Sequence, residues 1–160
     1  MHIYILLGGL YGLDGWIDSS GMLGLSHQVD KLPNTTVKSL SWSNYKSIIP
    51  EINQLTDKVV IIGYSGGGSR ATWLANETHK QIDLLVAYDP SPKWQIKHLP
   101  NTVLKAVCYY NKSPWMFGLG GGKLTGPQVT TYALGEQHLG IQFNQDLHDI
   151  TIAKIKELNA

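Results

Sequence analysis

Residues 58–67 read Lys-Val-Val-Ile-Ile-Gly-Tyr-Ser-Gly-Gly. Val59 to Ile62 are consecutive apolar, β-favouring residues, which is typical of a strand buried on both faces. Gly63-Tyr64-Ser65-Gly66-Gly67 has the pattern GxSxG, and a helical pattern follows it to about residue 77. Between a strand and a helix, this pattern indicates a sharp turn that lifts Ser65 Oγ out of the carboxyl end of the sheet.

Such a turn demands small residues two before and two after the serine, because the strand and the helix nearly collide there. Gly63 and Gly67 meet that demand. The first backbone N–H groups of the helix point toward Ser65, where an oxyanion would form. The alternative interpretation is a plain glycine-rich connection with a solvated serine.

Other strand-like runs alternate with helical patterns along the chain. The predicted strands are residues 2–7, 37–41, 58–64, 82–88, 103–110 and 129–134, and the predicted helices lie within residues 16–32, 44–55, 67–77 and 149–158. This alternation predicts an α/β fold in a single domain, residues 1–160, with about five to six mostly parallel strands and helices on both faces.

Composition narrows the possible partners. Thirteen Lys and Arg against twelve Asp and Glu give a net charge of +1, so no single-sign field would attract a nucleic acid or an anionic membrane. The apolar runs fall far short of the roughly 20 residues of a membrane-spanning helix, and no secretory signal is seen. We therefore expect no nucleic-acid partner, no integral membrane segment and a cytoplasmic location, with virion association or leaderless export as alternatives.

The single cysteine, Cys108, cannot form an intramolecular disulfide. It lies in the apolar run from Val103 to Tyr110, which predicts a buried and inert thiol. A reducing compartment fits this cysteine usage.

An activated serine needs a histidine and an orienting acid from the carboxyl ends of later strands. Asp89, in Tyr88-Asp89-Pro90, ends the predicted strand that follows the serine turn, so its carboxylate should lie at the same edge of the sheet as Ser65. A turn or helix-capping aspartate is the alternative interpretation.

The base must come from one of six histidines, which are His2, His27, His79, His98, His138 and His148. The first three lie at the wrong edge or before Asp89, and His98 lies in the loop after it. His138 and His148 lie between the last strand and the last helix, where a flexible segment could bring an imidazole over Ser65. We predict His148, because Asp149 is a candidate N-cap that would fix its backbone, and His138 is the alternative.

The serine turn, Tyr88-Asp89-Pro90 and Leu147-His148-Asp149-Ile150 together resemble the α/β-hydrolase superfamily, specifically small lipase-like and cutinase-like serine esterases. The resemblance spans nearly the whole chain and implies a minimal α/β-hydrolase core. In that superfamily the acid most often follows the strand two after the serine, near Asn111 here, and in some lipases it comes one strand earlier. Because no carboxylate lies between Asp89 and Glu136, Asp89 matches the earlier position.

The resemblance also implies two backbone N–H groups that would hold the oxyanion. One is that of Gly66, and the other comes from the loop after the first strand, at Leu10 or alternatively Gly9. Compared with the superfamily, this chain resembles a core without the usual first strands and without a large lid, so we expect an open, shallow site.

These residues predict a serine hydrolase that cleaves carboxylic esters or thioesters, with a small or polymer-linked acyl substrate and catalytic Ser65, Asp89 and His148. The alternative is a catalytically silent hydrolase-like binding domain, which the five tryptophans and eight tyrosines would serve. No cofactor is expected, and no Cys, His or carboxylate spacing resembles a metal site.

Overall fold

The computed structural model of the chain describes residues 1–9, 19–113 and 119–160. Its strands are β1 (His2–Leu7), β2 (Thr36–Ser41), β3 (Val59–Tyr64), β4 (Leu84–Tyr88), β5 (Ala106–Asn111) and β6 (Val129–Leu134). They form one sheet in the order β2-β1-β3-β4-β5-β6, and every neighbouring pair is parallel. The predicted α/β fold with a parallel sheet is confirmed.

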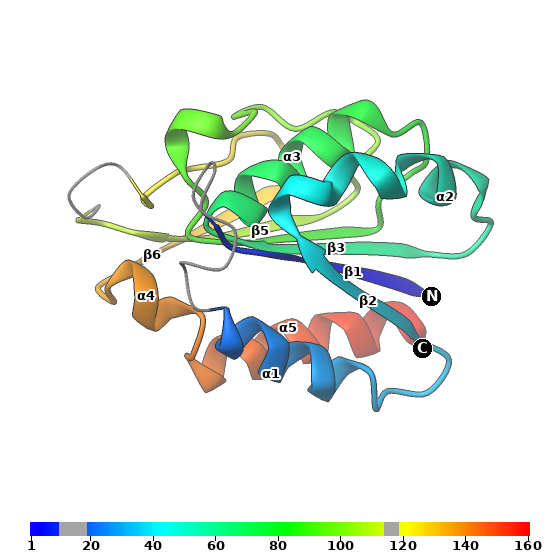
Figure 1. Cartoon of the computed structure of the whole chain (residues 1–160), viewed down its shortest axis with the longest axis horizontal. Coiled ribbons are helices and arrows are strands. Elements are labelled where there is room, and N and C mark those ends of the chain that lie inside the picture. The colour runs from blue at the N-terminus through cyan, green and yellow to red at the C-terminus, as the bar shows by residue number, and fades with distance from the viewer. Residues whose placement is uncertain (10–18, 114–118) are drawn as a thin grey trace.

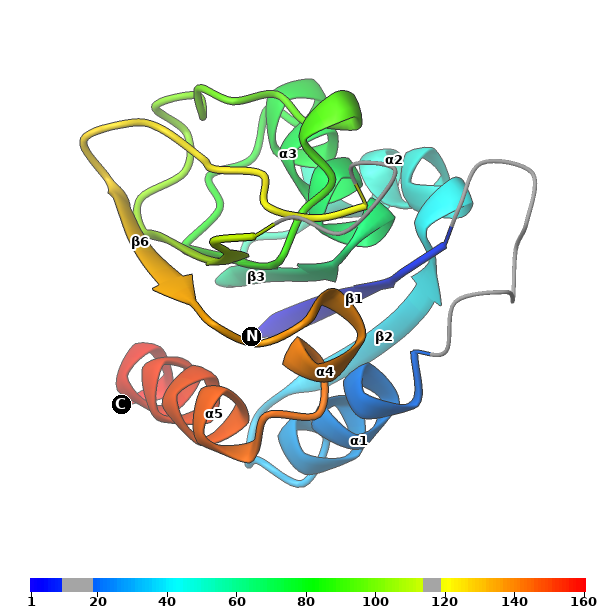
Figure 2. The same cartoon turned by 90° about the vertical axis from the view of Figure 1, so that its left-hand side faces the viewer.

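Helices lie on both faces of this sheet. They are α1 (Ser20–Val29), η1 (Trp42–Ile48), α2 (Ile49–Gln54), α3 (Gly66–Glu77), η2 (Pro92–Trp94), α4 (His138–Ile141) and α5 (Gln145–Asn159). Figure 1 shows α1 and α5 below the sheet and α2 and α3 above it. Figure 2 looks onto the edge of the sheet where the strands end, with α4 in front of it.

Strand side chains alternate between two hydrophobic clusters, one on each face of the sheet. In β1, Tyr4 and Leu6 join the cluster under α2 and α3, while Ile3 and Ile5 join the cluster under α1 and α5. All of β3 is buried, as a strand covered on both faces requires.

Two helical segments differ from the prediction. The expected helix over residues 44–55 divides into η1 and α2, with Pro50 in the first turn of α2, where its missing N–H costs nothing. The last helix begins at Gln145 and not near Asp149, because the Asn144 side chain caps it by accepting from the Leu147 N–H at 3.1 Å. The short helix α4 was not predicted.

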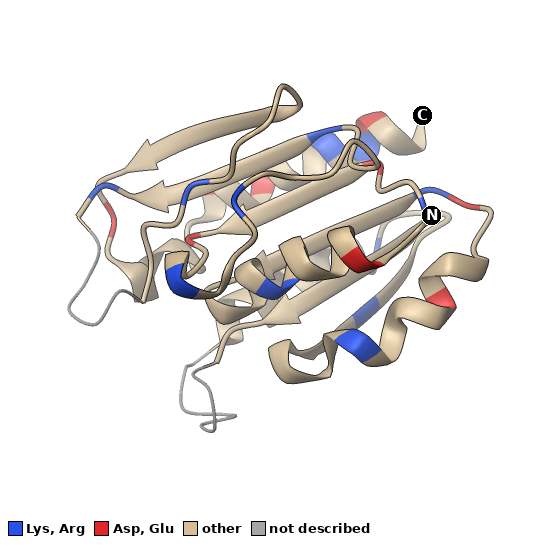
Figure 3. Ribbon diagram, turned by 90° about the horizontal axis from the view of Figure 1, so that it is seen from above, with Lys and Arg blue, Asp and Glu red and all other residues tan. Residues whose placement is uncertain are grey.

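Figure 3 shows Lys and Arg interspersed with Asp and Glu over the described part of the chain, in keeping with the near-zero net charge. No helix there is both long and apolar enough to cross a bilayer. Cys108 is free and buried, which confirms the expected burial of this thiol. Burial raises the pKa of the thiol to about 12.

The helix α3 approaches the strands β3 and β1 as closely as glycine allows. A Cβ on Gly63 would lie 2.4 Å from the Gly67 carbonyl oxygen, and one on Gly67 would lie 2.2 Å from the Leu6 carbonyl oxygen. Both neighbours are backbone atoms, so neither can move aside without shifting a strand or a helix.

We therefore expect Gly67→Ala to lower the free energy of unfolding by about 1–3 kcal/mol through overpacking. Gly24→Ala in α1 is the matched control, because a Cβ there would meet no atom of the described residues within 4 Å. It should raise stability by about 0.5–1 kcal/mol through helix propensity. Urea denaturation of both variants measures the difference, and equal stabilities would contradict the close approach.

Candidate active site

Ser65 occupies the strained turn between β3 and α3. Its backbone has φ 56° and ψ −121°, in the region that residues other than glycine rarely enter. Hydrogen bonds hold the turn from both sides, because the Ser65 N–H donates to the Tyr88 carbonyl at 2.9 Å and the Ser69 N–H donates to the Ser65 carbonyl at 3.1 Å. Strain of this kind persists only where the surroundings enforce it, and it is concentrated at functional sites.

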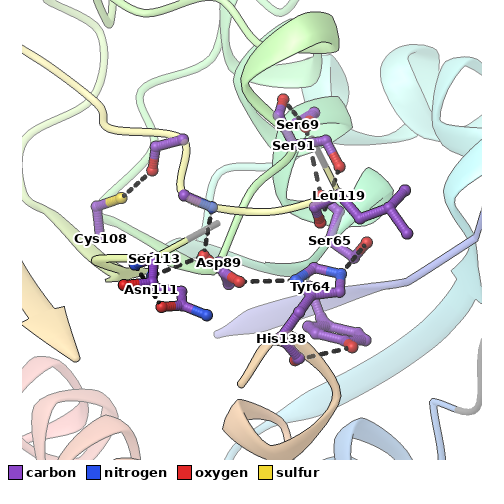
Figure 4. Close-up of polar contacts among 12 residues, drawn as sticks. Tyr64, Ser65, Ser69, Asp89, Ser91, Cys108, Asn111, Ser113, Leu119 and His138 are labelled. Atoms are coloured by element: carbon purple, nitrogen blue, oxygen red, sulfur yellow. Dashed lines mark hydrogen bonds and ion pairs between the residues drawn. The ribbon is translucent and has the colours of Figure 1, made fainter. Parts of the chain in front are cut away.

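Ser65, His138 and Asp89 form a chain of two hydrogen bonds (Figure 4). His138 Nδ1 lies 2.7 Å from Asp89 Oδ2, and His138 Nε2 lies 2.8 Å from Ser65 Oγ. An ionised carboxylate can only accept, so Nδ1 carries the imidazole proton and Nε2 accepts from the Ser65 hydroxyl. The imidazole is thereby oriented to take a proton from the serine.

The second oxygen of Asp89 is fully occupied by the backbone. Oδ1 accepts from the N–H of Asn111 at 2.8 Å and from the N–H of Gly121 at 2.7 Å. Asp89 itself has φ 43°, which directs the chain away from β4 at its end. These donors balance a completely buried carboxylate and fix which oxygen faces His138.

Gly120 lies directly against the pair formed by Asp89 and His138. A Cβ on Gly120 would lie 2.2 Å from Asp89 Oδ2 and 2.6 Å from His138 Nδ1. The glycine-rich segment before Lys123 therefore covers the acid and the histidine. From the sequence this segment could form one wall of a substrate groove or be an ordinary connection, and its contact with Asp89 and His138 was not predicted. Only its run of glycines signals such a close approach.

Tyr64 supports His138 from the sheet. The two rings are stacked with centroids 5.2 Å apart, and the Tyr64 hydroxyl donates to the His138 carbonyl at 3.1 Å. Tyr64 is fully buried, so this contact is a rigid platform for the imidazole.

The structure does not bring the predicted His148 to Ser65. His148 lies in the first turn of α5, where its Nε2 is 2.8 Å from the Gln142 carbonyl, and the alternative, His138, lies beside Ser65. The choice of His148 rested on a helix start at Asp149. With Asn144 as the N-cap, His148 is fixed inside a helix and cannot reach over the serine.

The expected open, shallow site is also corrected. Ser65 and Asp89 are 0% exposed and His138 is 1% exposed. A site closed to water strengthens hydrogen bonds between charged and polar groups.

Of the two expected oxyanion donors, Gly66 is the first residue of α3, directly after Ser65. The other, Leu10, lies outside the described residues. Its alternative, Gly9, is described, and a Cβ on Gly66 would lie 2.5 Å from the Gly9 carbonyl oxygen. Gly9, just after β1, therefore lies directly beside the start of α3. No three His, Cys, Asp or Glu side chains in residues 1–9, 19–113 and 119–160 group as metal ligands would.

No family model and no curated protein matches the chain. Solved structures do. Human thioesterase 2 superposes with a TM-score of 0.52 at 11% identity, over 99% of this chain and 98% of that one. Two crystal structures of acetylxylan esterase superpose with TM-scores of 0.53 and 0.51 at 12% and 13% identity, over 100% and 99% of this chain and 98% of theirs.

At sequence identities of 11–13%, the similarity to these structures shows a shared fold. The chain has the α/β-hydrolase-like fold of these esterases over its whole length, and the resemblance to cutinase-like hydrolases is confirmed at that level.

The cap of α5 can be tested directly. We expect Asn144→Ala to lower the free energy of unfolding by about 1 kcal/mol, because the N–H of Leu147 loses its acceptor. Asn144→Ser keeps a capping oxygen and should retain most of the stability, although it loses the amide contact with Glu136. Thermal and urea unfolding would measure both. A larger loss for Asp149→Ala than for Asn144→Ala would show that the helix begins where the sequence predicted.

Proposed function

We propose that the protein is a serine hydrolase that cleaves carboxylic esters or thioesters through an acyl-enzyme, with Ser65 as nucleophile, His138 as general base and Asp89 as orienting acid. The observation that carries the proposal is the buried chain of hydrogen bonds from Ser65 through His138 to Asp89, at 2.8 and 2.7 Å. The fold shared with a thioesterase and an acetylxylan esterase supports the same class of reaction.

In the first step, Ser65 Oγ attacks the carbonyl carbon of the substrate while His138 Nε2 takes the hydroxyl proton. The imidazolium that forms is stabilised by the carboxylate of Asp89, which two backbone N–H groups and His138 hold in place. The tetrahedral intermediate then collapses. The bond to the leaving oxygen or sulfur breaks, and His138 returns the proton to the departing alcohol or thiol.

The negative oxygen of the intermediate requires preorganised donors. The N–H of Gly66 is the donor next to Ser65, at the N-terminus of the 12-residue helix α3, whose dipole favours negative charge. In the second half of the reaction a water molecule takes the place of the alcohol. His138 accepts a proton from the water as the water oxygen bonds to the acyl carbon. The bond from that carbon to Ser65 Oγ then breaks, His138 returns the proton to Oγ, and the acid product is released.

We propose only the class of the substrate, which is a small or polymer-linked acyl ester or thioester. The residues at the site fix the type of reaction, and the walls of the binding pocket fix the substrate. The burial of Ser65 favours one competing function, a hydrolase-like binding domain without activity. The same experiment separates the two.

We expect a fluorophosphonate probe to form one covalent adduct per chain, on the peptide that contains Ser65, because only an activated serine beside an oxyanion-binding N–H reacts with it. Intact-mass and peptide-mapping spectrometry would measure the adduct. Ser65→Ala should abolish it and lower the turnover of a p-nitrophenyl ester by about 10⁴-fold. A folded protein that forms no adduct and hydrolyses neither esters nor thioesters would support the silent binding domain.

Gly120→Ala tests the contact between the acid and the base without changing either. The added methyl group overlaps Asp89 Oδ2, so the carboxylate and the imidazole must separate. We expect kcat for the same ester to fall about 100-fold. Gly135→Ala should leave kcat unchanged, because a Cβ there would meet nothing within 4 Å in the part of the chain that the structure describes. Equal rates in the two variants would argue against Asp89 as the orienting acid.

A further inference from the structure

The helix α4, which carries His138, is too short to hold its own position. It comprises only His138 to Ile141, and one turn of helix is unfavourable in isolation. Contacts from other elements must therefore fix the His138 backbone. Two carbonyls receive such contacts, those of His138 and Gln142, one at each end of the turn.

At the far end of the turn, the contact comes from His148. Its Nε2 lies 2.8 Å from the Gln142 carbonyl oxygen, and because a carbonyl can only accept, Nε2 carries the proton. His148 is 3% exposed, and its ring meets the edge of Tyr88 at 6.1 Å. Its Nδ1 has no hydrogen-bond partner within the described residues. The Gln142 carbonyl is thus the one polar contact of this imidazole there.

The start of α1 lies directly against the same carbonyl. A Cβ on Gly21 would lie 2.4 Å from the Gln142 oxygen, and Gln142 is 0% exposed. If His148 no longer donates, this buried carbonyl loses the hydrogen bond that ties it to α5, which is costly to leave unmade, and the turn is free to shift.

We propose that His148 is a positioning residue, whose hydrogen bond to the Gln142 carbonyl fixes α4 and thereby holds the His138 imidazole between Ser65 and Asp89. This inference rests on the proposed function for its effect on catalysis. Tyr64 fixes the first carbonyl of the turn and His148 fixes the last. Displacements of about 1 Å at a catalytic group cost on the order of 100-fold in rate, so this second histidine acts on kcat without touching the substrate.

The protonation state of His148 agrees with this role. Burial lowers the pKa of His148, against smaller opposing effects of the Gln142 carbonyl and Asp149. The imidazole therefore stays neutral at pH 7, with its single proton on the nitrogen that faces Gln142.

Three variants test the proposal. His148→Leu fills the site but removes the donor. His148→Gln keeps a side-chain N–H at about the reach of Nε2, yet it cannot act as a base. Thr151→Val is the matched control, because it removes the buried contact of 2.7 Å with the Tyr88 hydroxyl one turn along the same helix and leaves Gln142 untouched.

We expect His148→Leu to lower kcat for a p-nitrophenyl ester at least tenfold with little change in KM, and His148→Gln to stay within about threefold of the wild type. Thr151→Val should lower the melting temperature and keep kcat. Equal losses in His148→Leu and His148→Gln, or full activity in His148→Leu, would overturn the proposal. Loss of all activity in His148→Gln would instead point to His148 as the base.

A second readout does not depend on activity. Proton NMR detects the hydrogen on His138 Nδ1 that Asp89 accepts, downfield of the amide region. We expect this signal in the wild type, His148→Gln and Thr151→Val, and its loss or broadening in His148→Leu. If the wild type hydrolyses no ester but its NMR signal follows this pattern, the positioning role stands and the proposed function fails. A signal unchanged in His148→Leu would overturn the positioning role.

Discussion

The buried carboxylate of Asp89 is the constraint on which the rest of the site depends. A fully buried charge is tolerated only where hydrogen bonds replace its water, and Asp89 takes its donors from three separate parts of the chain. The N–H of Asn111 comes from the end of β5, that of Gly121 from the glycine-rich segment, and the imidazole of His138 from α4. The hydrogen bonds of this one carboxylate therefore fix the ends of two strands, a loop and a short helix relative to one another. The position near Asn111, which a carboxylate occupies in most of the superfamily that the sequence resembles, here supplies a backbone donor to the acid on the neighbouring strand.

Sheet topology brings these parts to one edge. All neighbouring strands are parallel, so the residues after β1, β3, β4 and β5 meet where the strands end. The chain passes from β1 outward to β2 and then returns to β3 on the other side of β1, and ligands of open α/β sheets bind at such a reversal. Ser65 follows β3 at this point. The glycines at positions 63 and 67 let strand and helix converge there, and the resulting strain holds the hydroxyl toward His138.

Long hydrophobic patterns in the sequence predicted the strands and the serine turn. They could not identify the histidine beside Ser65, because its position depends on one short helical turn. The apolar run before Gly63 and the GxSxG pattern identified the buried strand and the serine turn, and Pro90 marked where β4 ends beside Asp89. Choosing between His138 and His148 required the start of α5, and both Asn144 and Asp149 are residues that cap helices well. Asn144 followed by Asp146 in the first turn was the signal that could have decided it, since an acidic residue there favours a helix start. The helix α4 contains Gly140 and spans four residues, so no periodicity could reveal it.

The tyrosines bear on whether this fold is used for catalysis or for binding. Their number suited a surface that binds a partner, yet Tyr4, Tyr64, Tyr88 and Tyr109 are among the largest fully buried side chains. Two of them act on the helices that carry the histidines. Tyr64 stacks on His138, while the Tyr88 hydroxyl contacts Thr151 and donates to the Leu147 carbonyl of α5 beside His148. Aromatic rings with a polar tip suit this task, because they fill a core and still fix a backbone carbonyl. In this chain, Tyr64 contacts both the ring and the backbone of His138, whereas the contacts of Tyr88 stabilise α5. Packing of the core and orientation of His138 therefore share the contacts of Tyr64.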